Sequence, residues 1–176
     1  AHMHYTPTSG GNRKTWTFSG WFKRGSLGDN ARLFGADTDS NNRVELMLAN
    51  DSDVLRLELL NASDDGDLVT TQVFRDVSAW YHVVVAVDTT QGTAANRVKI
   101  YVNGTQVTSF STETYPDEDE EYEVNHTVQH MVGKSVRYDL PYDGYMAEVV
   151  FIDGTAYAAS DFGEFDEDSP TIWKPK

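Results

Sequence analysis

The chain has 176 residues, no cysteine and a formal net charge of −14 at pH 7, from 14 basic and 28 acidic residues. This length suits one domain with a sizeable core, and the lack of cysteine excludes a disulfide framework and thiolate chemistry. The negative charge repels a phosphate backbone, and no apolar run approaches the roughly 20 residues of a membrane span. We therefore expect no nucleic-acid partner and no insertion into a membrane.

The predicted elements begin after a polar lead-in, residues 1–14, whose first three residues resemble the remnant of a tag. We expect the chain to be a domain cut from a larger protein. Large apolar side chains over residues 15–22 predict a strand with Trp16 on one face and Trp21 on the other. Similar patterns predict further strands over 31–35, 43–48, 54–59 and 68–74.

Residues 80–88 form the predicted central strand. Both of its alternating faces are apolar, so the strand should be covered on both sides. The next run, 98–102, has one apolar face and ends on Asn103-Gly104, a dipeptide that suits a type I′ turn. We expect these two strands to pair in a large antiparallel sheet.

An acidic segment over 116–123 then interrupts the pattern. It carries six carboxylates in eight residues, so we expect it in solvent unless a cation neutralises it. Strands resume over 128–132 and 144–152, and residues 171–173 should fold back onto the body. Helical patterns of useful length are absent, which predicts an all-β protein. A sandwich and a closed barrel both fit these strands.

Two segments carry a family resemblance. Trp80-Tyr81-His82-Val83, followed by Val98-Lys99-Ile100-Tyr101-Val102-Asn103-Gly104, resembles the core of laminin-G-like and pentraxin-like domains of the concanavalin A-like lectin group. Residues 144–154 resemble the last core strand of that group. With Phe74-Arg75-Asp76 and Phe162-Gly163-Glu164 added, the set is similar to such domains in tail-fibre and structural proteins of bacteriophages. The resemblance implies one domain over 15–176 that folds as a two-sheet antiparallel jelly-roll sandwich.

A calcium site is the first candidate for chemistry. Hard cations prefer oxygen ligands from short side chains in loops. In pentraxin-like relatives an Asp-Asn pair just before the equivalent strand ligates calcium, and acidic partners follow a strand that ends in glycine. That segment here, 133–137, has no acid, although Asp139 or Asp143 could substitute. The alternative is a plain turn whose side chains bond their own backbone. The candidate ligands are Asp37, Asp39, Asn41 and Asn42.

A glycan site is the second candidate. Sugars stack on aromatic faces and bond to planar polar groups on loops above a rigid scaffold. Tyr138, Asp139, Tyr142 and Asp143 offer this mixture in one loop. The alternative is that the tyrosines only cover the edge of the sheet.

Glycoside hydrolysis is the third candidate. In retaining glycosidases with this fold, the catalytic segment resembles the motif Glu-x-Asp-x-x-Glu on a strand. The nearest match here, 118–123, lies in the acidic segment and has Glu120 where the motif expects Asp. We therefore assign no catalytic residue. His82, in the central strand, should make a structural hydrogen bond.

These observations favour a non-enzymatic, lectin-like module of a phage or cell-surface adhesion protein, with calcium as its cofactor. Its partners would be a cell-surface glycan and other subunits of a larger structural protein, at the virion surface or outside the cell. The alternative is a packing module of a viral fibre or capsid without a ligand of its own. Fold alone does not decide between them.

Overall fold

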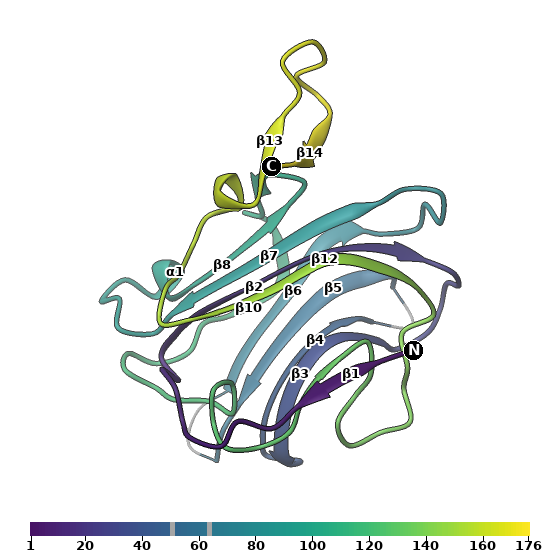
Figure 1. Cartoon of the computed structure of the whole chain (residues 1–176). Coiled ribbons are helices and arrows are strands. Elements are labelled where there is room, and N and C mark those ends of the chain that lie inside the picture. Colours follow the sequence, from purple (N-terminus) through teal and green to yellow (C-terminus); the bar gives the residue numbers. More distant parts are fainter. Residues whose placement is uncertain (50–51, 63–64) are drawn as a thin grey trace.

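The computed structural model describes residues 1–49, 52–62 and 65–176, whose strands form two antiparallel sheets stacked face to face (Figure 1). In the described part of the chain, the larger sheet has the order β1 (Met3–Tyr5), β11 (His130–Val132), β3 (Ala31–Asp39), β4 (Asn42–Leu48), β5 (Val54–Leu60), β6 (Asp65–Val73) and β10 (Phe110–Thr114). The smaller sheet has the order β12 (Gly144–Asp153), β2 (Thr15–Arg24), β7 (Tyr81–Asp88), β8 (Val98–Val102) and β9 (Thr105–Gln106). The remaining elements are α1 (Ala94–Arg97), a 3-10 turn (Ala159–Asp161) and a hairpin of β13 (Gly163–Phe165) and β14 (Trp173–Pro175).

The core lies between the two sheets. On β2, the side chains of Trp16, Phe18 and Phe22 are at most 2% exposed and point inward, as the alternation predicts. Val83 and Val85 of β7 join them. Full burial of a side chain of this size contributes roughly 1.5–3 kcal/mol. The architecture is therefore the two-layer antiparallel sandwich that the resemblance implies, and the closed barrel is wrong.

The strand β3 is longer than the sequence predicts. It continues through the Asx-rich segment, where Asp37 pairs with Arg43 and Asp39 with Asn42. Only two residues remain in the turn between β3 and β4. The predicted turn over 37–42 is thus wrong in extent, because cross-strand pairing overrides the turn preference of short polar side chains.

The acidic segment is only partly in solvent. Its last residue, Glu123, is 6% exposed and accepts a hydrogen bond of 2.7 Å from the Thr38 hydroxyl. Arg13 lies 3.6 Å from the same carboxylate. The cation that neutralises this end of the segment is therefore a guanidinium.

The C-terminal segment covers the outer face of the smaller sheet. The Thr17 hydroxyl donates to the carbonyl of Thr155 at 2.7 Å, and Trp173 contacts β7. The hairpin tip stands away from the body (Figure 1). Of the predicted segment 171–173, Trp173 folds back onto the body, whereas Thr171 and Ile172 are exposed in the hairpin. The central strand is covered on both sides, as predicted. Among the described residues, no helix has the length and apolar composition that crossing a membrane requires.

Candidate functional site

A cleft opens on the outer face of the smaller sheet, where the base of the hairpin meets β2 and β12. Its volume is about 360 Å³. We call it the tryptophan cleft because three of its walls are indole rings, one from β2, one from the residue before β7 and one from β14. Its lining residues are Trp21, Trp80, Ala147, Glu148, Trp173, Lys174 and Pro175.

The alternation of β2 and β7 places two of the indoles. Trp21 points outward because Phe22, its neighbour on β2, points into the core. The Trp21 ring stacks on the His82 ring of β7, with centroids 4.9 Å apart. Trp80 is 41% exposed at the mouth of the cleft. The sheet thus presents one buried and one accessible indole.

Trp173 is held in place from three sides. Its indole Nε1 donates to Nδ1 of His82 at 3.0 Å, and the two rings stack with centroids 6.1 Å apart. Its ring lies directly against Gly104, in the turn between β8 and β9, and against Gly163 of β13, where a Cβ atom would overlap it. The glycine of the predicted type I′ turn therefore also makes room for Trp173.

The hydrogen bonds of His82 fix its tautomer. Because Nδ1 accepts from Trp173, the proton of the neutral ring is on Nε2, which donates to the Ser19 hydroxyl at 2.9 Å. Burial lowers the pKa of His82 to about 4. His82 therefore cannot remove a proton from Ser19. The structural role predicted for this histidine is confirmed.

Glu148 reaches the cleft through a β-bulge. Ala147 pairs with Trp21 and Val150 with Ser19, so Glu148 and its neighbour share one position opposite Gly20. The φ angle of Glu148 is 49°, in the left-handed region that favours glycine and costs other residues roughly 1–2 kcal/mol. The bulge places Ala147 and Glu148 in the cleft side by side.

The two charged side chains of the cleft differ in their partners. Lys174 Nζ lies 3.1 Å from Asp166 and 3.7 Å from Glu164, and the hydrogen bond with Asp166 raises the pKa of Lys174. Among the described residues, the Glu148 side chain has no hydrogen-bond or ion-pair partner. A carboxylate free to accept hydrogen bonds beside several indole faces is the composition of a small-molecule site.

The four residues of the predicted glycan loop do not all face solvent in the structure. Tyr138 is 46% exposed, and Asp139 is exposed and pairs with Lys134 at 2.9 Å. Tyr142 is 7% exposed and packs edge-on against Phe22. Burial raises the pKa of the Tyr142 hydroxyl. The structure therefore places Tyr142 in the core, because the loop turns inward before β12.

The other residue of that prediction, Asp143, lies exposed just before β12, where its carbonyl accepts from the Gly25 amide at 2.9 Å. The four side chains thus do not form one surface. Tyr138, Asp139 and Asp143 face solvent, and Tyr142 does not.

The predicted calcium ligands already have partners. Asp37 accepts from Arg137 at 3.0 and 3.3 Å, and burial raises the pKa of Asp37 although Arg137 acts against it. Asp39 accepts from the amide of Asn41 at 2.8 Å and from the side chain of Asn42 at 2.9 Å. The bond from the Asn41 amide is the main reason for a lowered pKa of Asp39.

The two carboxylates therefore belong to separate hydrogen-bond networks. Within the described ranges, no three His, Asp or Glu side chains are arranged to hold a metal ion. A calcium ion at this place would have to displace the partners of both carboxylates, and calcium binding stays a prediction.

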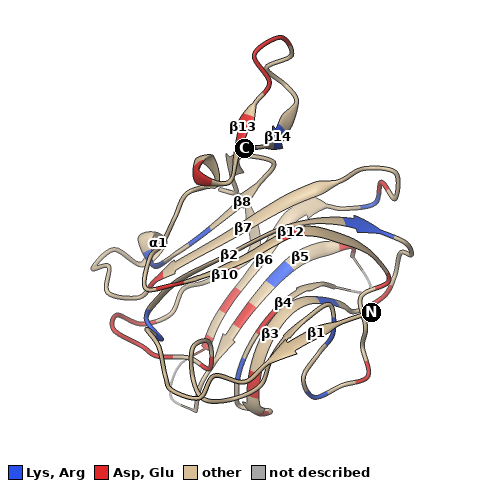
Figure 2. Ribbon diagram, in the orientation of Figure 1, with Lys and Arg blue, Asp and Glu red and all other residues tan. Residues whose placement is uncertain are grey.

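Acidic residues lie on three neighbouring strands of the larger sheet (Figure 2), and the alternation of these strands places their side chains on the outer face. Glu45 pairs with Glu58, and Glu58 with Asp67, on β4, β5 and β6. Each is bound by an arginine, at 3.1 Å for Arg32 and Glu45 and 2.8 Å for Arg56 and Asp67. Glycoside hydrolysis needs one carboxylic acid and one free carboxylate. This row is a salt-bridge ladder and shows no catalytic arrangement.

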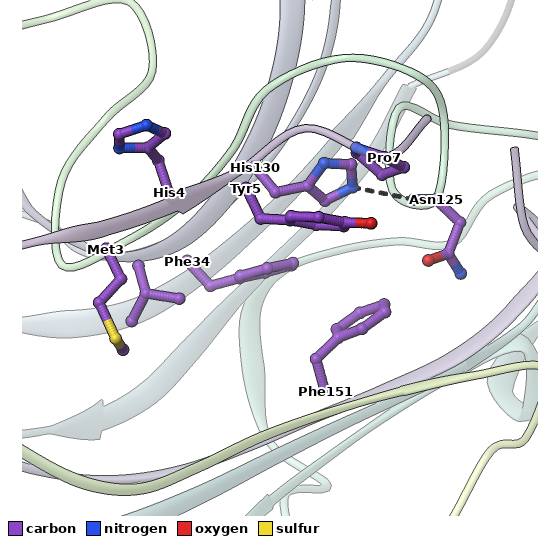
Figure 3. A pocket seen from close by; sticks show the side chains of 9 residues that line it. Met3, His4, Tyr5, Pro7, Phe34, Asn125, His130 and Phe151 are labelled. Carbon is purple, nitrogen blue, oxygen red and sulfur yellow. Dashed lines mark hydrogen bonds between the residues drawn. The ribbon is translucent and has the colours of Figure 1, made fainter. Parts of the chain in front are cut away.

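A second cavity, of about 350 Å³, lies at the edge of the sandwich under β1 (Figure 3). Phe34 and Phe151 stack in it with centroids 5.6 Å apart, and the Tyr5 ring stands over them. Both ring nitrogens of His130 are engaged, Nδ1 with the Val128 carbonyl and Nε2 with the Asn125 amide. The cavity is apolar and offers few free groups to orient a sugar.

The chain is thus an antiparallel two-layer sandwich with a tryptophan-lined cleft on the outer face of one sheet. The family described as the concanavalin A-like lectin/glucanases superfamily matches residues 3–160. The chain therefore belongs to this family. The hairpin that supplies Trp173 lies outside the matched residues. No curated protein matches the sequence significantly.

Solved structures share the fold at low sequence identity. Domain 4 of the extracellular arabinanase AbnA from Geobacillus stearothermophilus, solved with arabinotriose, has a TM-score of 0.62 and 18% identity over 83% of this chain and 64% of that one. The CBM40 of the IT-sialidase from Ruminococcus gnavus, solved with α2,3-sialyllactose, has a TM-score of 0.60 and 17% identity over 92% and 94%. A heptameric SAP-like pentraxin from Limulus polyphemus has a TM-score of 0.58 and 14% identity over 85% and 68%. The chain spans less than two thirds of the arabinanase domain, and these identities show the fold alone.

Sequence reasoning missed the tryptophan cleft. The alternation did place Trp21 on the face of its strand opposite Trp16, which was the available signal. The position of Trp173 depends on a contact with His82 across 91 residues, and the bulge at Glu148 breaks the alternation of β12.

Proposed function

We propose that this protein is a non-enzymatic, lectin-like module that binds carbohydrate in the tryptophan cleft. The observation that carries the proposal is the convergence of Trp21, Trp80 and Trp173 on one cleft above a rigid sheet. Indole faces stack on the C–H surface of a sugar ring, and Glu148 accepts hydrogen bonds from its hydroxyls. The sugar complexes of two domains with this fold, the arabinanase domain and the sialidase CBM40, support the proposal.

Two solvent-facing residues of the loop predicted from the sequence, Tyr138 and Asp139, are proposed as a second, weaker contact for longer glycans. The module would belong to a phage or cell-surface adhesion protein, acting at the virion surface or outside the cell. The resemblance to tail-fibre domains supports this setting. Other subunits of that protein would be its second class of partner.

The proposal is tested on a glycan array, probed with and without calcium, followed by titration of tryptophan fluorescence with the glycans that bind. We expect Trp80→Ala to weaken binding at least about tenfold, since an exposed aromatic anchor carries much of the binding energy. Tyr145→Ala is the matched control, because Tyr145 is 67% exposed on β12 and does not line the cleft. An array without signal in both conditions contradicts the proposal.

A packing module without a ligand is the second candidate. The exposed apolar side chains of the hairpin, Phe165 at 44% and Ile172 at 56%, favour it. This function predicts a defined oligomer in sedimentation experiments that Ile172→Ser dissociates. A monomer that binds glycans would rule it out.

A further inference from the structure

We propose that the tryptophan cleft selects glycans with positively charged amino groups, such as oligomers of glucosamine, over neutral and acidic glycans. The inference rests on the proposed function and adds the ligand class. It starts from the charges in the cleft wall. Lys174 is neutralised by Asp166 and Glu164, whereas no side chain of the described residues neutralises Glu148.

The same carboxylate also lines the adjoining hollow of about 200 Å³, beside Asp161 and Lys176. The Lys176 ammonium donates to the Ser160 carbonyl at 2.9 Å, and Asp161 accepts from the Ala158 amide at 3.0 Å. Of the charged side chains that line these two hollows, Glu148 is thus the one that has no hydrogen-bond or ion-pair partner among the described residues. A cationic group would supply that partner.

The indole rings of the cleft also favour a positively charged ligand. The face of an indole attracts a cation, and tryptophan does so more strongly than the other aromatic residues. Trp80, Trp173 and Glu148 line the same cleft, so a cationic ligand bound there meets both indole rings and the carboxylate. The amide N–H of a neutral N-acetyl group can still donate to Glu148, but it lacks the positive charge that strengthens this bond and that attracts the indole face.

The backbone at Glu148 points to a role for its side chain. At a bulge residue with a φ of 49°, glycine is the residue that avoids strain. Strained backbone that carries a specific side chain into a cleft is a mark of functional positions. The carboxylate is kept here at a cost to the stability of β12.

The whole-molecule charge adds a long-range contribution. A net charge of −14 raises the local concentration of cationic ligands and repels acidic glycans. This contribution is screened by salt, whereas the contact with Glu148 is local and is screened less. A substitution at Glu148 therefore separates the local contact from the long-range contribution of the net charge.

The experiment titrates tryptophan fluorescence with a glucosamine oligomer and with its N-acetylated counterpart, at about pH 5.5 so that the sugar amines are protonated. We expect the glucosamine oligomer to bind about tenfold more tightly. Glu148→Gln, which keeps the shape and removes the charge, should abolish this preference, because the affinity for the glucosamine oligomer falls by more than the affinity for the N-acetylated oligomer. Glu167→Gln is the matched control, since it removes one exposed charge from the hairpin tip, outside the cleft.

Equal or tighter binding of the N-acetylated oligomer overturns the inference and leaves the proposed function standing. The same holds if Glu148→Gln keeps the preference, or if neutral array glycans bind in the cleft while the glucosamine oligomer does not. If no glycan binds at all, the inference and the proposed function both fall.

Discussion

His82 connects the sheet to the wall of the tryptophan cleft. Its two ring nitrogens bond to Ser19 and to Trp173, and its ring stacks on the ring of Trp21. The residue pattern of the central strand was enough to predict a structural hydrogen bond for it. The identity of the partner was not predictable, because Trp173 is 91 residues away in the sequence and belongs to a hairpin whose position depends on the fold.

His82 makes stability dependent on pH. Its pKa is about 4 in the folded protein and about 6.5 in an unfolded chain, so between these values the unfolded chain binds a proton that the folded one does not. Stability therefore falls as the pH drops through this window, by on the order of 3 kcal/mol. Urea unfolding at several pH values measures it. His82→Gln should unfold more easily at neutral pH and lose less on acidification; an equal loss would contradict this role for His82.

The hairpin of β13 and β14 is the element on which the cleft depends. It lies beyond the residues matched by the family, and its Trp173 packs on Gly104 of a turn in the sheet. Strands with strong alternation, such as those over 15–22, 80–88 and 98–102, were predictable. β1 and β13, of three residues each, were not, because their position follows from pairing with distant strands.

Gly104→Ala tests the docking of this hairpin. The new methyl group would overlap the Trp173 ring, and alanine at a φ of 80° adds roughly 1–2 kcal/mol of strain. We expect a loss of stability together with weaker glycan binding. Gly154→Ala is the matched control, with a φ of 81° and no atom within 4 Å of the new methyl group. Gly154→Ala should lose stability only through the backbone strain and should keep its glycan binding. A similar loss of binding in both variants would count against the docking of the hairpin on Gly104.

At the scale of the whole molecule, two sheets support polar networks on their outer faces and an apolar core between them. The fold class was predictable because the alternation and the family resemblance agree. The metal prediction used the same resemblance and fits the structure less well. Its carboxylates are engaged by Arg137 and by neighbouring asparagines, which composition alone does not reveal.

Thermal unfolding with millimolar calcium and with a chelator tests the calcium prediction. A site filled at about a hundred times its dissociation constant would add roughly 2.7 kcal/mol, a rise in Tm of about 5–10 °C for a domain of this size. Because Asp37 and Asp39 already have partners, we expect no such rise. A rise of this size would restore the calcium site that the sequence predicts.

The central claim is that a glycan occupies the tryptophan cleft. The four tryptophan indole N–H signals in a two-dimensional NMR spectrum report on it directly, since Trp21, Trp80 and Trp173 line the cleft and Trp16 is buried in the core. Titration with the tightest-binding array oligosaccharide should shift the three cleft signals and leave that of Trp16 in place. Shifts confined to residues 134–143, with all four indole signals unmoved, would contradict the account.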